Sequence, residues 1–166
     1  MENFKAFNWK RIRTIAESMP FYWYVPTVYA IIFVIGIPLE YLTNLLHIPD
    51  KEITSQVIPD SFFLKILLVV TVVPFLETFL TQALPYYFLS LFQFMKRNQW
   101  LIILISGILF GSFHIFSLQH IIYGTIIGFF LSGTYVVRAK KGDSFLCTYL
   151  LHAFFNLVAI LISQFS

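Results

Sequence analysis

Charged residues are absent from two long stretches of this chain, and this absence limits what the chain can fold into. None lies between Arg97 and Arg138, and none follows Asp143. About 20 consecutive apolar residues are enough to cross a bilayer as a helix. Because 58% of the 166 residues are hydrophobic and only 11% are charged, the chain has too little polar surface for a soluble protein. We therefore predict an all-α fold, a polytopic membrane helical bundle.

The apolar runs predict about five transmembrane helices and an interfacial segment within a single membrane domain, residues 1–166. Residues 1–20 are basic and amphipathic, which is typical of an arm at the membrane surface. The second apolar run is too long for one span, so we divide it at Pro85, where the interfacial segment begins. The predicted spans are residues 21–46, 62–84, 100–116, 120–137 and 145–162.

Two GxxxG pairs lie in the third and fourth predicted spans: Gly107 with Gly111, and Gly124 with Gly128. Glycines at this spacing let two helix backbones approach closely. Only a few residues join these two spans. We therefore expect them to pack as an antiparallel hairpin.

The distribution of Lys and Arg predicts the orientation of the chain in the membrane. Nine of these residues fall on one side of the predicted topology, and only Lys51 and Lys65 fall on the other. The sequence therefore predicts a multi-pass protein of the cell membrane, with its N-terminus inside and its C-terminus outside. Because the basic residues gather at helix ends and not along one face, we expect membrane lipid as a partner and no nucleic acid.

Four polar residues lie inside the predicted spans, where lipid makes them costly: Glu77, His114, His152 and Asn156. A carboxylate at the centre of a span costs about 2.5–3.5 kcal/mol on insertion scales. Each of the four also fits a structural hydrogen bond between helices when taken alone. Together, however, a Glu and a His supply a general base and a proton shuttle for water.

His152 and Asn156 lie four residues apart, so they share one helical face. A His and an amide there offer hydrogen-bond donors toward an oxyanion. The full set predicts hydrolysis of a carbonyl compound, above all a peptide bond. Counted from the inner face, His114 lies deeper than His152, so a tilted helix or a re-entrant section must bring them level.

These motifs resemble those of the CAAX protease and bacteriocin-processing family (CPBP, or Abi-type, intramembrane proteases). FGSFH, which ends at His114, matches the family's Phe-x-x-x-His, and HAFFN, which begins at His152, matches its His-x-x-x-Asn. Glu77 opens a segment like its Glu-Glu-x-x-x-Arg motif. The resemblance covers residues 73–157, a protease-like core. It implies an intramembrane endopeptidase for prenylated, peptide or membrane-protein substrates, in which Glu77 and His114 activate water, and His152 and Asn156 stabilise the oxyanion.

The family is often labelled metalloprotease, so a metal has to be considered. Glu and His side chains are able to ligate Zn²⁺. The sequence has no HExxH helix, and the same residues also allow a glutamate mechanism without metal. We expect no metal and no cofactor, with zinc as the less favoured alternative.

The chain departs from the first family motif at two positions. Thr78 stands where the family has its second Glu, and Gln82 stands where it has Arg. We interpret the pair as a neutral hydroxyl–amide hydrogen bond that replaces an acid–guanidinium bridge. The alternative is a catalytically inactive family member that acts as a membrane accessory or bacteriocin-immunity protein. A third reading, a proton-coupled transporter that uses Glu77 as a relay, lacks the expected internal repeat.

Overall fold

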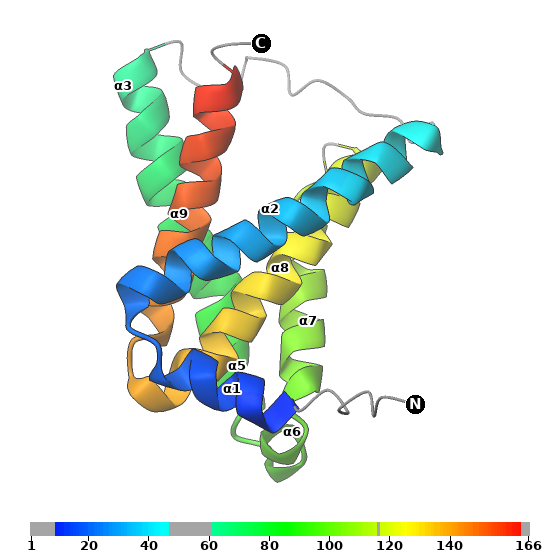
Figure 1. Cartoon of the computed structure of the whole chain (residues 1–166). Helices are drawn as coiled ribbons and strands as arrows, with labels where there is room; N and C mark the ends of the chain where they lie inside the picture. Colours follow the sequence, from blue (N-terminus) through cyan, green and yellow to red (C-terminus); the bar gives the residue numbers. More distant parts are fainter. Residues whose placement is uncertain (1–8, 47–60, 116, 164–166) are drawn as a thin grey trace, which may run out of the picture.

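The computed structural model describes residues 9–46, 61–115 and 117–163, and these residues form helices and no strand. The predicted all-α fold is therefore confirmed (Figure 1). The elements, in chain order, are α1 (Trp9–Ser18), α2 (Phe21–Leu45), α3 (Phe62–Lys65), η2 (Ile66–Val72), α4 (Val73–Thr78), η3 (Phe79–Ala83), α5 (Leu84–Leu89), α6 (Gln93–Arg97), α7 (Gln99–Ser112), α8 (Leu118–Arg138), η4 (Ala139–Lys141) and α9 (Ser144–Ser163).

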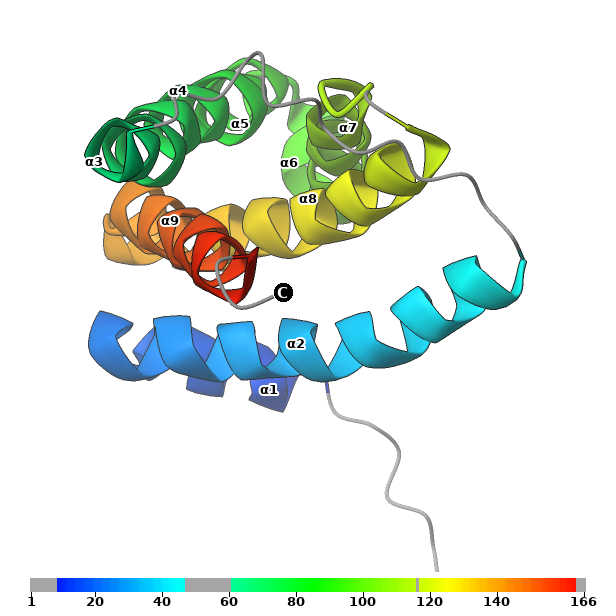
Figure 2. The same cartoon turned by 90° about the horizontal axis from the view of Figure 1, so that it is seen from above.

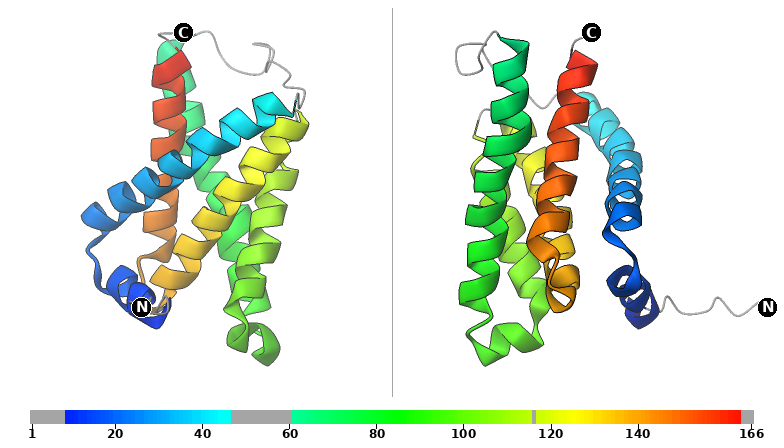
Figure 3. Two further views of the ribbon diagram at one scale, coloured as in Figure 1. Left: turned by 45° about the vertical axis from the view of Figure 1, so that its right-hand side comes forward. Right: turned by 90° about the vertical axis from the view of Figure 1, so that its left-hand side faces the viewer.

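The helices stand in three rows when the bundle is viewed from above (Figure 2). The first row consists of the helical run from α3 to α5 together with α7. The middle row consists of α8 and α9. The third row is α2, with α1 beneath it. The side view in Figure 3 shows the same order, with α9 between the α3–α5 run and α2. The middle row therefore touches both outer rows, and α9 packs against α4 on one side and α2 on the other.

Among the residues that the structure describes, four helical segments are long and apolar enough to cross a membrane: Phe21–Thr43, Phe62–Leu89, Leu118–Lys141 and Ser144–Ile162. Large apolar side chains on them face outward; Phe63, for example, is 72% exposed. The third predicted span is shorter than expected, because α7 has 14 residues and ends at Ser112. At 1.5 Å per residue, α7 rises only about 21 Å, less than the roughly 30 Å of a hydrocarbon core.

The predicted break at Pro85 is wrong, because the helical run continues through this residue to Leu89. Wide π-helical turns explain how the run absorbs its two prolines. In η2 the N–H of Val73 bonds to the carbonyl of Leu68, five residues back. The next donor in this series would be Pro74, which has no N–H. The π pattern therefore ends at the proline, and η3 repeats the arrangement before Pro85.

The predicted antiparallel hairpin is formed by α7 and α8, and glycines set their separation. A Cβ added at Gly111 would lie 2.7 Å from the backbone nitrogen of Thr125, and one added at Gly128 would lie 2.7 Å from the carbonyl oxygen of Gly107. Both obstacles are backbone atoms, which cannot move aside as a flexible side chain can. The two helices therefore touch backbone to backbone.

Gly111→Ala should destabilise the protein by about 1–3 kcal/mol, because the added methyl group must force the hairpin apart. Gly133→Ala is the matched control, since an added Cβ there meets nothing within 4 Å. The control should stabilise the helix by up to about 1 kcal/mol, because alanine favours helix over glycine. Thermal unfolding in detergent measures both changes. Shifts of the same sign would contradict the close contact at Gly111.

The connection after α8 holds one end of the bundle together through a buried guanidinium. Arg138 is 0% exposed, and it pairs with Asp143 through its Nε, 2.9 Å from Oδ1, and its Nη2. Its Nη1 donates to the carbonyls of Ala16 and Met19, at 3.2 and 2.5 Å. Its charge also lies 4.9 Å from the ring centre of Tyr24. Arg138 thus joins α1, α2 and the start of α9 to α8.

The described basic residues outside the long helices gather at this same end. Figure 1 shows α1 and α6 at one end of the bundle, with α3 and the last turn of α9 at the other. The loop that contains Lys51 lies outside the described residues. The arrangement fits the predicted orientation, which stays a prediction.

Candidate functional site

A carboxylate and an imidazole meet between the first and middle rows of helices. Glu77 lies on α4 and His152 lies on α9, and 3.3 Å separates Glu77 Oε2 from His152 Nε2. The two side chains are 25% and 4% exposed. Because 75 positions separate them in the chain, only the packing of α4 against α9 brings them together. The contact joins the first and last of the sequence motifs.

Phe110 connects the second histidine to this pair. Its ring centre lies 4.7 Å from that of His114 and 5.2 Å from that of His152. The three predicted residues Glu77, His114 and His152 therefore gather in one region.

His114 lies just after the C-terminal end of α7. The helix ends at Ser112, and the chain leaves helical geometry at His114. The residue that was expected to lie too deep in a full span therefore sits just beyond the end of a short helix. The expected tilt or re-entrant section stays a prediction.

One hydrogen bond fixes the chemistry of His114. Its Nδ1 lies 2.9 Å from the carbonyl oxygen of Phe110. A carbonyl oxygen only accepts, so Nδ1 must carry the hydrogen, and Nε2 of the neutral ring is left as a proton acceptor. The bond also holds the ring at one orientation. His114 therefore presents a basic nitrogen away from α7.

Asn156 lies one helical turn from His152, and its amide is already in use. Its Nδ2 donates to the carbonyl of Val69, at 2.8 Å. In the π pattern of η2 this carbonyl would accept from Pro74, which has no hydrogen to give. Asn156 supplies the missing donor and links α9 to η2. In the sequence, the signal for this bond is a proline within one span and an amide within another. The predicted oxyanion role of Asn156 stays a prediction.

Thr78 and Gln82 are both buried, at 0% and 1% exposure, but they do not bond to each other. Thr78 Oγ1 and both polar atoms of the Gln82 amide have no hydrogen-bond partner. The predicted hydroxyl–amide bond is therefore wrong. Gln82 lies in η3, whose wider turns move a residue out of the alignment that residues four apart have in an α-helix.

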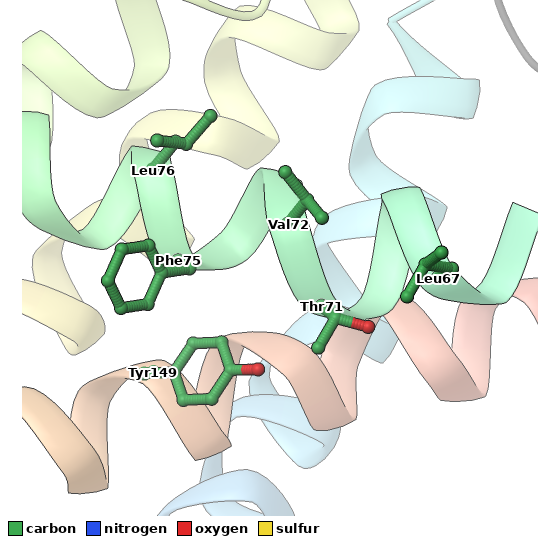
Figure 4. A pocket seen from close by; sticks show the side chains of 6 residues that line it. All are labelled: Leu67, Thr71, Val72, Phe75, Leu76 and Tyr149. Atoms are coloured by element: carbon green, nitrogen blue, oxygen red, sulfur yellow. The ribbon is translucent and has the colours of Figure 1, made fainter.

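A shallow apolar pocket of about 260 Å³ lies on the flank of the same helix pair. Figure 4 shows that Phe75 and Leu67 of the α3–α5 run and Tyr149 of α9 line it, together with Thr71, Val72 and Leu76. Its lining does not include Glu77 or His152. The pocket is thus a groove in the apolar outer surface, separate from the polar pair.

A catalytic zinc ion takes more protein ligands than the contact between Glu77 and His152 supplies. In the described part of the chain, no group of three or more His, Cys, Asp or Glu side chains lies close enough to hold a metal ion. Catalytic zinc sites take three protein ligands and an open position. Glu77 and His152 would supply two of these.

Apolar spans around a carboxylate–imidazole pair define a polytopic membrane protein with a polar site between its helices. Residues 59–158 match the family model described as type II CAAX prenyl endopeptidase Rce1-like. The match covers more than half of the chain, and the protein belongs to this family. The suspected relation to CAAX proteases is thereby confirmed, and the family supports an endopeptidase-type function in the membrane. Neither the curated proteins nor the solved structures gave a match.

Proposed function

We propose that this protein is an intramembrane endopeptidase that cleaves prenylated, peptide or membrane-protein substrates of the CAAX type. The contact between Glu77 and His152 is the observation that carries this proposal. It lies inside the matched family region. Placing a carboxylate in a membrane interior costs free energy. A carboxylate beside an imidazole can take part in proton transfer, which gives a functional reason for its presence.

In this mechanism Glu77 removes a proton from a water molecule, whose oxygen then attacks the carbonyl carbon of the peptide bond. The π electrons of the carbonyl move to its oxygen and form the oxyanion. His114 Nε2 accepts a hydrogen bond from the same water and orients it. Glu77 then gives its proton to the leaving nitrogen, the C–N bond breaks, and a carboxylic acid and an amine are released.

His152 changes partners during this reaction. Before attack its Nε2–H points to the Glu77 carboxylate, because a carboxylate only accepts. Once Glu77 is protonated, its oxygen is a weaker acceptor, and the N–H can turn to the oxyanion. Asn156 retains a second N–H beyond the one bonded to Val69, and we assign it to the same oxyanion.

We propose that the reaction needs no metal and no cofactor, with zinc as the alternative. A purified sample in lipid vesicles should cleave a fluorogenic farnesylated peptide at the same rate with and without a chelator. His114→Ala should lower the rate by about 100-fold, because the hydrogen-bond acceptor that orients the attacking water is lost. Loss of cleavage with chelator, restored by Zn²⁺, would establish the metal version. No cleavage by the unmutated protein on any prenylated peptide would favour the inactive accessory or immunity protein.

We further propose that the protein lies in the cell membrane as a multi-pass protein with the α1 end inside. The gathering of α1, α6 and η4 at one end of the bundle supports this orientation. The N-terminus would then lie inside and the C-terminus outside.

A further inference from the structure

A second set of polar side chains lies on the α1 side of Glu77 and His152, inside the bundle. Its members share two properties in the described part of the chain: their polar atoms are buried, and these atoms have no hydrogen-bond partner in the protein. We call the set the polar layer. It consists of Thr78, Gln82, Ser106, Ser132 and Thr148.

The register of α7 and α8 places two members next to each other. Ser106 lies four residues before Phe110, one turn nearer the α1 end of the bundle. Ser132 lies four residues after Gly128 on the antiparallel α8, and a Cβ at Gly128 would lie 2.8 Å from Phe110 Cβ. Both serines are therefore one turn below the level of Phe110, on facing helices.

The other two helices repeat this displacement. Thr148 lies four residues before His152 on α9, and Gln82 lies four residues after Thr78. Both steps lead toward the α1 end (Figure 1). The segment that carries Gln82, η3, lies against both α7 and α8. The α3–α5 run, α7, α8 and α9 thus each carry a buried polar side chain about one turn from the site.

Such a layer is not stable when dry. A buried donor or acceptor that is left unsatisfied costs about 1–3 kcal/mol, and folded proteins rarely leave such groups unpaired. Gln82 sets the strictest demand, since its amide needs both a donor and an acceptor. Water offers both, and internal water is the usual partner of buried polar groups in proteins.

His152, which belongs to the candidate site, also has a buried ring nitrogen that needs a hydrogen-bond partner. Its Nε2 faces the carboxylate of Glu77 and so carries the hydrogen. Its Nδ1 is then an acceptor, and this atom is buried without a partner. A donor has to reach it, and Thr148 lies one turn away on the same helix.

We propose that the polar layer binds a cluster of ordered water molecules, one of which donates a hydrogen bond to His152 Nδ1. The bond would hold the imidazole with its Nε2–H toward Glu77. Water is the occupant we infer, and not a cation, because every side chain of the layer is neutral. The cluster does not depend on catalysis and would be present in an inactive protein.

Thr148→Val tests the proposal through the sign of a stability change. Valine has nearly the shape of threonine, and Thr148 Oγ1 has no protein partner to lose. A dry layer therefore predicts a higher Tm, whereas a hydrated layer predicts that Tm falls by about 2–4 °C. Thr71→Val is the matched control, because Thr71 is exposed on the surface pocket of Figure 4. It should shift Tm by less than Thr148→Val. An unchanged or higher Tm for Thr148→Val would overturn the proposal.

A second measurement detects the water directly in the unmutated protein. A short X-ray pulse turns bound water into hydroxyl radicals, which oxidise nearby side chains. Phe110 is 2% exposed, so internal water is needed to label it. We expect labelling in the unmutated protein and at least a halving in the Thr148→Val, Gln82→Met double variant. Absent labelling, or equal labelling in the double variant, would show that the layer holds no water.

Discussion

Glu77→Gln should reduce peptide cleavage by about 10²–10⁴-fold, the usual contribution of a general base. Glutamine keeps the size of glutamate and one oxygen acceptor, but its amide cannot take a proton from water. The contact between Glu77 Oε2 and His152 Nε2 therefore loses its chemical function while the helices stay packed. The measurement is kcat/KM on a farnesylated peptide in vesicles, with circular dichroism to show that the helices remain.

Glu17→Gln makes the same chemical change far from the site. Glu17 lies on α1, where its Oε1 accepts from Arg13 Nε at 2.8 Å. This variant should cleave at the unmutated rate. If Glu77→Gln also kept the normal rate, the water-activating role of Glu77 would be disproved, and the non-catalytic alternative would gain support.

Arg138→Leu should lower the free energy of unfolding by about 3 kcal/mol, because it leaves the partners of a buried charge unpaired. The change removes the ion pair with Asp143 and both hydrogen bonds to the carbonyls at the end of α1. Unfolding in detergent, followed by circular dichroism, measures the loss. Arg13→Leu is the control: it breaks a partly exposed pair with Glu17, and such pairs contribute less than about 1 kcal/mol. Equal losses in the two variants would contradict the role of Arg138.

Asp143 makes this contribution dependent on pH. Burial raises the pKa of the Asp143 carboxyl, but the hydrogen bond and charge of Arg138 outweigh it, and the net pKa is lowered. An unfolded aspartate titrates near pH 4. The stabilisation is therefore complete above that pH and is lost as the pH falls through the lowered, folded value. The difference in stability between the unmutated protein and Arg138→Leu should accordingly shrink when the sample is acidified below about pH 4.

The sequence predicted the helical class well, because it follows from local patterns. Long runs without charge required spans, and Glu77 stood out as a carboxylate within one of them. The same logic failed at Pro85, where proline usually ends a helix. A π turn before Pro85 let the run continue, and no local pattern distinguishes this outcome from a break.

Partnerships across helices were harder to predict. Thr78 and Gln82 were expected to bond because they lie four residues apart, but the turn geometry of η3 separates them. Asn156 found a partner in Val69, 87 positions away, and Arg138 reached α1 across more than 100 positions. Each of these contacts depends on the packing of several helices, which the spacing of residues does not encode.

The bond from Asn156 to Val69 gives the His-x-x-x-Asn motif a second reason to persist. Its amide supplies the hydrogen that Pro74 cannot give, so a relative that no longer cleaves peptides would still be selected to keep the asparagine wherever the proline remains. Retention of this motif then marks an intact scaffold before it marks a working enzyme. Among the described residues, the Glu77 side chain makes no hydrogen bond of this kind to a backbone group. If Glu77 has the proposed role, its loss would therefore distinguish inactive relatives from active ones.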